Sequence, residues 1–234
     1  MATTDQESPV SATAVAVGKP FPESYRKTAV LVGVLFLLAT AAFAVGSALI
    51  TSYFSEAKQA STLLAGVLIQ GVSAVAVAGI GVAMLPVLKR YNVGLAHGYR
   101  ALRVGEGLMI ISAGVYMLTT KNEFFRYDAF IYMFTASAGL IFSYLLYVSG
   151  LIPRFLALLG LVGYTTLAIG IPVTLMSTVR LDEGWGLIFV AAGAVFELVV
   201  PLLLIFKGFS TGKEEPRLGG DHLSDPVEQI AVPV

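Results

Sequence analysis

Long runs without a charged residue dominate this chain and decide what it can fold into. Four such runs, free of Asp, Glu, Lys and Arg, cover residues 28–55, 59–88, 129–153 and 155–179. A helix that crosses a bilayer needs roughly 20 consecutive, mostly apolar residues, and every run is that long. Two further apolar stretches carry few charges: 99–120 is interrupted by Arg103 and Glu106 and has Arg100 at its start, and 184–206 contains only Glu197.

These stretches predict an all-α, polytopic membrane helix bundle with six transmembrane helices, at about 28–50, 62–87, 99–120, 128–148, 153–177 and 184–206. A β-barrel is disfavoured because the runs lack the alternation of apolar and polar residues that barrel strands need. The six-helix domain is expected to cover residues 28–207. Both tails, 1–27 and 208–234, are expected to be disordered, since they are polar or rich in Gly and Pro, and the first has no signal-peptide core.

Composition excludes several classes of function. Hydrophobic residues make up 56% of the chain and charged residues 13%, against about 25% charged residues in soluble domains. The formal net charge of zero argues against a nucleic-acid partner, and the absence of cysteine removes thiol chemistry and Cys-bound metal. The only histidines, His97 and His222, are far apart, so we expect no metal and no cofactor. No catalytic motif is present, and an enzyme is not expected.

Lysine and arginine predict the orientation. Eleven of them fall on the side of the two termini: Lys19, Arg26, Lys27, Lys89, Arg90, Arg100, Arg103, Arg154, Lys207, Lys213 and Arg217. Four fall on the other side: Lys58, Lys121, Arg126 and Arg180. The positive-inside rule then places both termini in the cytoplasm of a bacterial cell and the helices in its cytoplasmic membrane.

The charges inside the predicted helices are the candidate site. At 1.5 Å per residue, Glu106 is expected about 10 Å and Glu197 about 13 Å from the cytoplasmic face. Arg103 shares a helical face with Glu106, and Arg154 begins a helix on the same side. Pro201 leaves the carbonyl of Glu197 without its helical N–H partner.

Two interpretations of this cluster remain open. An ionisable group at membrane depth costs about 2.5–3.5 kcal/mol on insertion scales, which favours a functional role. The four residues would then line a cytoplasm-facing cavity that binds an ion, a proton or a polar head group. Alternatively, Arg103 pairs with Glu106, and Glu197 finds Arg154 or a hydroxyl group, and the network only fixes helix packing.

Four short motifs together resemble a family of bacterial six-helix membrane proteins known as domain-of-unknown-function family 4386. They are Arg26–Ala29 running into Gly33, Leu85–Asn92, Leu151–Arg154 running on to Gly160 and Gly163, and Phe196–Glu197 running through to Phe209. The resemblance covers about residues 26–209 and implies the six-helix architecture. It implies no activity, but it marks Arg103, Glu106, Arg154 and Glu197 as residues to test.

The sequence therefore predicts a non-enzymatic multi-pass membrane protein that binds or transports a small ligand, a proton or a lipid through this cluster. The alternative is a structural or regulatory membrane subunit. Besides the bilayer, the expected partner is a small ligand or an anionic lipid, the latter at the basic residues around His97.

Overall fold

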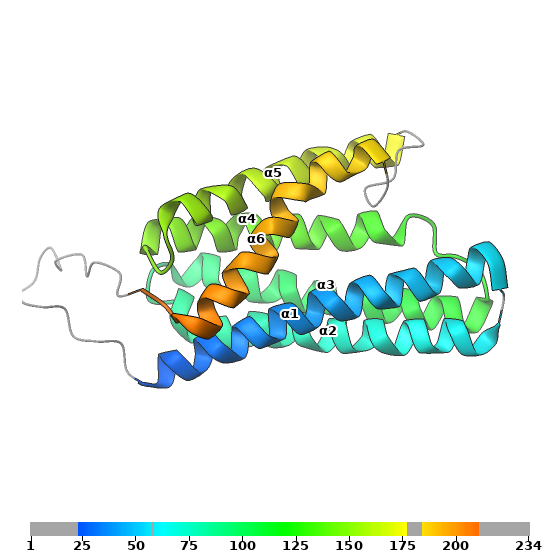
Figure 1. Cartoon of the computed structure of the whole chain (residues 1–234), viewed down its shortest axis with the longest axis horizontal. Coiled ribbons are helices and arrows are strands. Elements are labelled where there is room, and N and C mark those ends of the chain that lie inside the picture. Colours follow the sequence, from blue (N-terminus) through cyan, green and yellow to red (C-terminus); the bar gives the residue numbers. More distant parts are fainter. Residues whose placement is uncertain (1–22, 58, 177–183, 211–234) are drawn as a thin grey trace, which may run out of the picture. The chain divides into compact units, whose positions relative to one another are not determined.

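The computed structural model describes residues 23–57, 59–176 and 184–210, and these form an all-helical bundle (Figure 1). Its six long helices are α1 (Glu23–Ser52), α2 (Ala60–Leu88), α3 (Val93–Thr120), α4 (Tyr127–Ser149), α5 (Arg154–Met176) and α6 (Leu187–Phe206). A short π-helix (Tyr53–Ala57) extends α1, and a short 3-10 helix (Gly184–Gly186) precedes α6. All six long helices are long and apolar enough to cross a membrane, as the sequence predicted.

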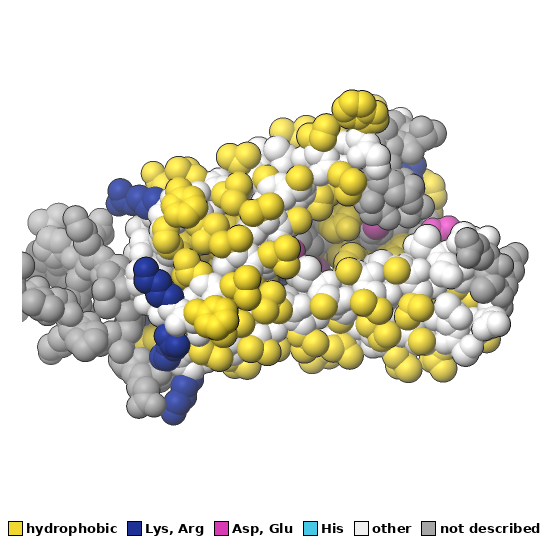
Figure 2. Space-filling model, in the orientation of Figure 1, with side chains coloured by type: hydrophobic (Ala, Val, Ile, Leu, Met, Phe, Trp, Pro, Cys, Tyr) yellow, Lys and Arg dark blue, Asp and Glu magenta, His cyan; other side chains and the backbone are white. Residues whose placement is uncertain are grey.

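The helices form a closed ring in sequence order, because each packs on the next and α6 returns to α1. We call the end where α1 begins and α6 ends the terminal end, and the opposite end the far end. The far end carries the end of α1, the loop between α3 and α4, and the start of α6 (Figure 1). Between the described ends of the helices, apolar side chains cover most of the visible surface, as lipid contact requires (Figure 2).

At the terminal end, α1 and α6 come into close contact and close the ring. A methyl group placed on Gly33 of α1 would lie 2.7 Å from the Pro201 carbonyl oxygen and from the Ile205 side chain of α6. Beside this contact, the Arg26 side chain donates hydrogen bonds to the carbonyl oxygens of Ile205 and Phe206, at 3.3 and 3.2 Å. These are carbonyls that the end of a helix leaves without an N–H partner. The start of α1 is thereby fastened to the end of α6.

Two helix starts differ from the sequence-based prediction. Helix α3 begins at Val93 rather than at 99, because the Asn92 side chain accepts a hydrogen bond from the Leu95 N–H at 2.9 Å and caps the helix. Helix α1 begins at Glu23, so residues 23–27, predicted as part of a disordered tail, are helical. Of the predicted C-terminal tail, residues 208–210 are described, and the Ser210 N–H donates a hydrogen bond to the Leu151 carbonyl oxygen at 2.8 Å. The remaining parts of the predicted tails, 1–22 and 211–234, lie outside the described residues.

Candidate cavity between the helices

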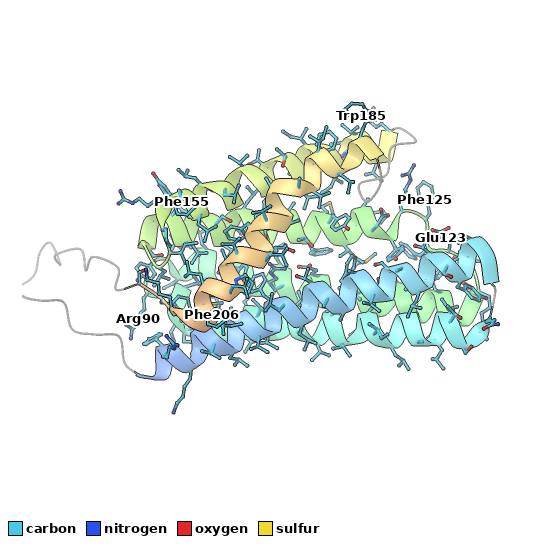
Figure 3. The ribbon with its side chains drawn as sticks, viewed as in Figure 1. Arg90, Glu123, Phe125, Phe155, Trp185 and Phe206 are labelled. Atoms are coloured by element: carbon cyan, nitrogen blue, oxygen red, sulfur yellow. The ribbon has the colours of Figure 1, made fainter. Side chains whose placement is uncertain are left out.

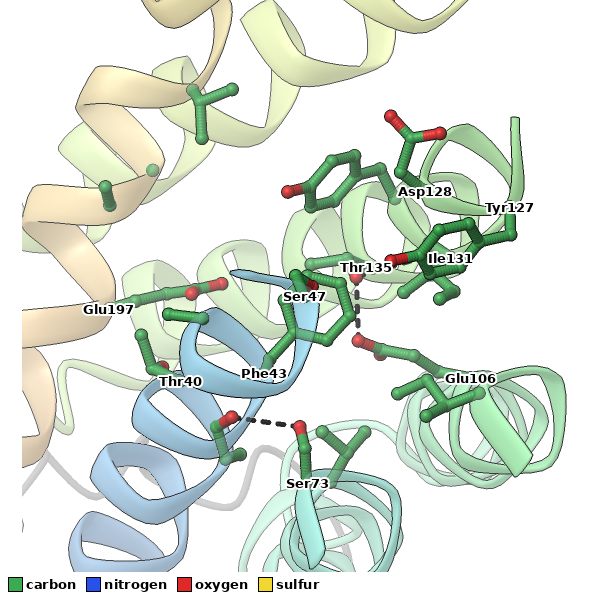
Figure 4. Close-up of a pocket in the computed structure, with 18 of the residues that line it drawn as sticks. Thr40, Phe43, Ser47, Ser73, Glu106, Tyr127, Asp128, Ile131, Thr135 and Glu197 are labelled. Atoms are coloured by element: carbon green, nitrogen blue, oxygen red, sulfur yellow. Dashed lines mark hydrogen bonds between the residues drawn. The ribbon is translucent and has the colours of Figure 1, made fainter. Parts of the chain in front are cut away.

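A cavity of about 1210 Å³ reaches from the far end to the middle of the bundle. Its mouth is formed by residues near the end of α1, in the loop between α3 and α4, and at the start of α4: Ser52, Ser55, Glu123, Phe125, Arg126, Tyr127 and Asp128. Its floor includes Arg103 and Glu106 of α3, Tyr164 of α5 and Glu197 of α6. Figure 4 shows the carboxyl groups of Glu106 and Glu197 pointing into the same space from opposite sides. Side chains from two helices that are distant in the sequence therefore face each other across the cavity.

On the α3 side of the floor, the two charged groups neutralise each other. The Arg103 Nη1 donates to Glu106 Oε2 at 3.0 Å, and both side chains are almost fully buried. The Thr135 hydroxyl of α4 donates to Glu106 Oε1 at 2.7 Å (Figure 4). Both carboxylate oxygens of Glu106 are thus satisfied, as a buried charge requires. Arg103 Nη2 is buried without a hydrogen-bond partner within the described residues, which leaves one donor for a water or a ligand.

On the α6 side, Glu197 is held differently. The Tyr164 hydroxyl of α5 donates to Glu197 Oε1 at 2.9 Å, and Glu197 is only partly buried. Within the described residues, no cation lies within salt-bridge distance of its carboxylate. The contact that brings Tyr164 to this place is a close approach of α5 and α6 at Gly163 and Gly193. Glu197 is therefore a positioned carboxylate that faces open space.

Aromatic rings close the bundle between the cavity and the terminal end. Phe142 of α4 stacks on Phe36 of α1 at 5.9 Å and on Tyr99 of α3 at 5.1 Å between ring centroids. Phe196 of α6 meets the edge of the same ring at 6.4 Å. All four side chains are buried, so rings from four helices form an apolar plug, which we call the aromatic plug. The Arg103 guanidinium lies 5.4 Å from the Phe36 ring centroid, at the boundary of plug and cavity.

Comparison of the sequence with known protein families identifies the family of this chain. Residues 30–208 match the family described as "Domain of unknown function (DUF4386)". The chain belongs to the DUF4386 family. The match covers the described helices from α1 to the end of α6, and it confirms the resemblance that the sequence motifs carried. Comparison with curated proteins and with solved structures found no match.

The structure of this DUF4386 protein brings together three of the four residues singled out from the sequence. Arg103, Glu106 and Glu197 all line the cavity. Arg154 does not: it is exposed at the first turn of α5, near the terminal end, with its guanidinium 6.0 Å from the Tyr147 ring. The expected grouping of Arg154 with the other three was wrong, because the first residue of a helix cannot reach a site at its middle.

The expected direction and depth of the cavity also need correction. The cavity opens at the far end and not toward the termini, because α1 and α6 converge at Gly33 while the aromatic plug fills the core there. Since α3 begins at Val93, Glu106 lies about 20 Å from the start of its helix, near the midpoint. Glu197, about 13 Å from Phe206, is also near the middle of α6.

The sequence indicated Arg103 as a partner of Glu106, but it did not identify the two hydroxyl groups that bind the carboxylates. Thr135 and Tyr164 carry no charge, so nothing in the sequence distinguishes them from other residues of their helices. Only the pairing of helices across the ring reveals their role, because Thr and Tyr are ordinary residues in a membrane helix. No group of three metal-ligating side chains exists among the described residues, so nothing there suggests a metal centre.

Proposed function

We propose that this DUF4386 protein binds a small, positively charged organic ligand in the cavity, with Glu197 as the counter-charge. The observation that carries the proposal is the charge of the cavity lining. All four acids whose side chains the structure describes line the cavity, namely Glu106, Glu123, Asp128 and Glu197. Of the described basic residues only Arg103 and Arg126 do. The described part of the lining, when fully ionised, thus carries a net charge of −2.

The aromatic part of the lining supports the same ligand class. Phe43 and Tyr132 lie 6.1 Å apart between ring centroids in the cavity wall, and Tyr164 adds a third ring at the floor. Ring faces attract cations, and the attraction grows as the site loses water. A cation near Glu197 would therefore meet a carboxylate and aromatic faces in one place, whereas an anion would meet repulsion.

The proposed orientation places both termini in the cytoplasm of a cell whose cytoplasmic membrane holds the protein. Its support is the distribution of the described charges: the Lys and Arg side chains visible in Figure 2 gather mainly at the terminal end. In Figure 3, Arg90 lies near this end, while Glu123 lies near the far end. Under the positive-inside rule the terminal end faces the cytoplasm, and the cavity then opens to the outside.

The test is the thermal stability of the purified protein in micelles with added tetramethylammonium chloride, at an ionic strength matched with sodium chloride. A ligand that binds only the folded state stabilises it by about 2.7 kcal/mol at a concentration one hundred times its Kd. We expect tetramethylammonium to raise the Tm of the wild type and of a Lys89→Gln control, whose exposed side chain does not line the cavity. The Glu197→Gln variant should fold but give no response.

Sodium acetate serves as the matched anion. An equal rise of Tm with acetate would contradict the proposal, because the negative lining should reject an anion. A Glu197→Gln variant whose Tm rises with tetramethylammonium as much as that of the wild type would also contradict the proposal. If this variant fails to insert or fold, the carboxylate is structural, and the membrane-subunit interpretation replaces ours.

A further inference from the structure

The cavity has a side opening as well as a mouth, and this opening lies between α1 and α6. Figure 2 shows the surface hollowed between these helices, with acidic side chains visible inside. Small or polar residues of α1 form one edge, including Thr40, Ala44 and Ala48. Residues of α6 form the other, including Val190, Ala194 and Leu198. Ala44, Ala48, Ala194 and Leu198 are exposed although they line the cavity.

Near the depth at which α1 and α6 separate, the other five pairs of neighbouring helices are in close contact. A methyl group on Gly46 would lie 2.9 Å from the Gly66 carbonyl oxygen, which closes α1 against α2. Comparable approaches of 2.7 and 2.9 Å close α2 against α3 at Gly114 and α3 against α4 at Gly105. Gly139 contacts Tyr164 between α4 and α5, and Gly163 contacts Gly193 between α5 and α6.

The edges of the opening continue directly into the apolar outer surface of the bundle. Val45 and Val195, the neighbours of Ala44 and Ala194, are 52% and 48% exposed and do not line the cavity. In a bilayer these outward faces of α1 and α6 contact lipid chains. A molecule that enters between the two helices therefore comes from the hydrocarbon region and reaches Glu197 at its middle depth.

We infer that the ligand is a single-chain cationic amphiphile, whose charged head binds at Glu197 and whose hydrocarbon chain lies in the opening between α1 and α6. This inference rests on the proposed function and adds the ligand's apolar part and its route. The charge of the lining selects a cationic head, and the opening at the level of the lipid chains accommodates a hydrocarbon tail. A wholly water-soluble cation would leave this apolar opening unused.

The test is equilibrium binding of radiolabelled dodecyltrimethylammonium to the protein in nanodiscs, after subtraction of binding to empty nanodiscs. Tetramethylammonium has the same head without the chain, and dodecyl sulfate has the same chain with the opposite charge. We expect saturable binding of dodecyltrimethylammonium at least tenfold tighter than that of tetramethylammonium, and no saturable binding of dodecyl sulfate. The Glu197→Gln variant should weaken binding of the cationic amphiphile at least tenfold.

Tryptophan substitutions test the route. Ala44→Trp and Ala194→Trp place a large side chain in the opening, and each has a matched control one residue away, Val45→Trp and Val195→Trp. We expect each opening variant to weaken dodecyltrimethylammonium binding at least tenfold and each control to leave it within twofold. All four positions are exposed, and a retained rise of Tm with tetramethylammonium shows that a variant is folded.

Several outcomes would overturn the inference. Equal affinity for the two cations would do so, as would saturable binding of dodecyl sulfate with similar affinity. Opening variants that behave like their controls would also refute the route. If tetramethylammonium still stabilises the protein through Glu197 in these cases, the proposed function stands and only the amphiphile and its route are lost. If neither cation depends on Glu197, both proposals fail.

Discussion

The contact of α5 with α6 at Gly163 can be tested by one methyl group. In Gly163→Ala the new carbon would lie 2.7 Å from the Gly193 Cα, whereas carbon atoms pack at about 3.5–4.0 Å. The obstacle is backbone, which cannot rotate away, so the helices must separate by about 1 Å to restore normal packing. Overpacking of this kind costs about 1–3 kcal/mol, offset by about 0.5–1 kcal/mol because Ala favours a helix over Gly. Taking the middle of both ranges, we expect a net loss of about 1 kcal/mol.

The same shift should reach the cavity. The bond from Tyr164 to Glu197 is 2.9 Å long, and a separation of about 1 Å would carry it past the hydrogen-bonding range. The stabilisation by tetramethylammonium should therefore fall together with the free energy of unfolding.

Unfolding by sodium dodecyl sulfate in mixed micelles, followed by helical circular dichroism, measures the stability of this variant. Gly71→Ala is the matched control, because a methyl group on Gly71 of α2 would meet nothing within 4 Å. This control should be as stable as the wild type or more so. If Gly163→Ala is as stable as Gly71→Ala, the backbones of α5 and α6 are not in contact at this point, and the argument that positions Tyr164 fails.

Three further predictions follow from the described contacts. Thr135→Val removes the 2.7 Å bond to Glu106 and should lower the free energy of unfolding by about 1–3 kcal/mol, with Thr135→Ser as the rescuing control. Arg103→Met should lower the free energy of unfolding by about 3–5 kcal/mol, because it leaves the Glu106 charge buried and unpaired. Adding Glu106→Gln to this variant should recover part of the loss. If the effects of the two substitutions are strictly additive, Arg103 and Glu106 do not stabilise the protein as a pair. The chain has no cysteine of its own, so a single introduced cysteine can be labelled selectively. Arg90→Cys should react with a membrane-impermeant maleimide only from the cytoplasm, and Phe125→Cys only from outside. The reverse pattern would overturn the proposed orientation.

The architecture was predictable because hydropathy and length alone define a membrane helix. Every described span corresponds to an apolar run in the sequence. The start of α3 was missed because its first two turns contain Gly94, His97 and Arg100, which lower the hydropathy. The deciding signal was the capping side chain of Asn92. Hydropathy reports which residues tolerate lipid, and it does not report where hydrogen bonding begins a helix.

The site was predictable in part, for a different reason. Charges inside apolar runs are conspicuous, so Arg103, Glu106 and Glu197 could be found by inspection. The direction of the cavity could not, because it depends on which end of α1 approaches α6. That approach is determined by Gly33 against Pro201, two residues far apart in the chain and ordinary when taken alone.

The aromatic plug around Phe142 has an electrical consequence. A cavity that holds water conducts ions, so a transmembrane voltage would fall mainly across the dry layer that the stacked rings of Phe36, Tyr99 and Phe142 form. A cation at Glu197 would then remain close to the potential of the medium at the far end, and its binding would respond weakly to voltage. Carrying the same charge past the rings would cost or release nearly the full value of about 2.3 kcal/mol per 100 mV. Under the proposed function, the position of the plug would leave cation binding at Glu197 nearly insensitive to voltage.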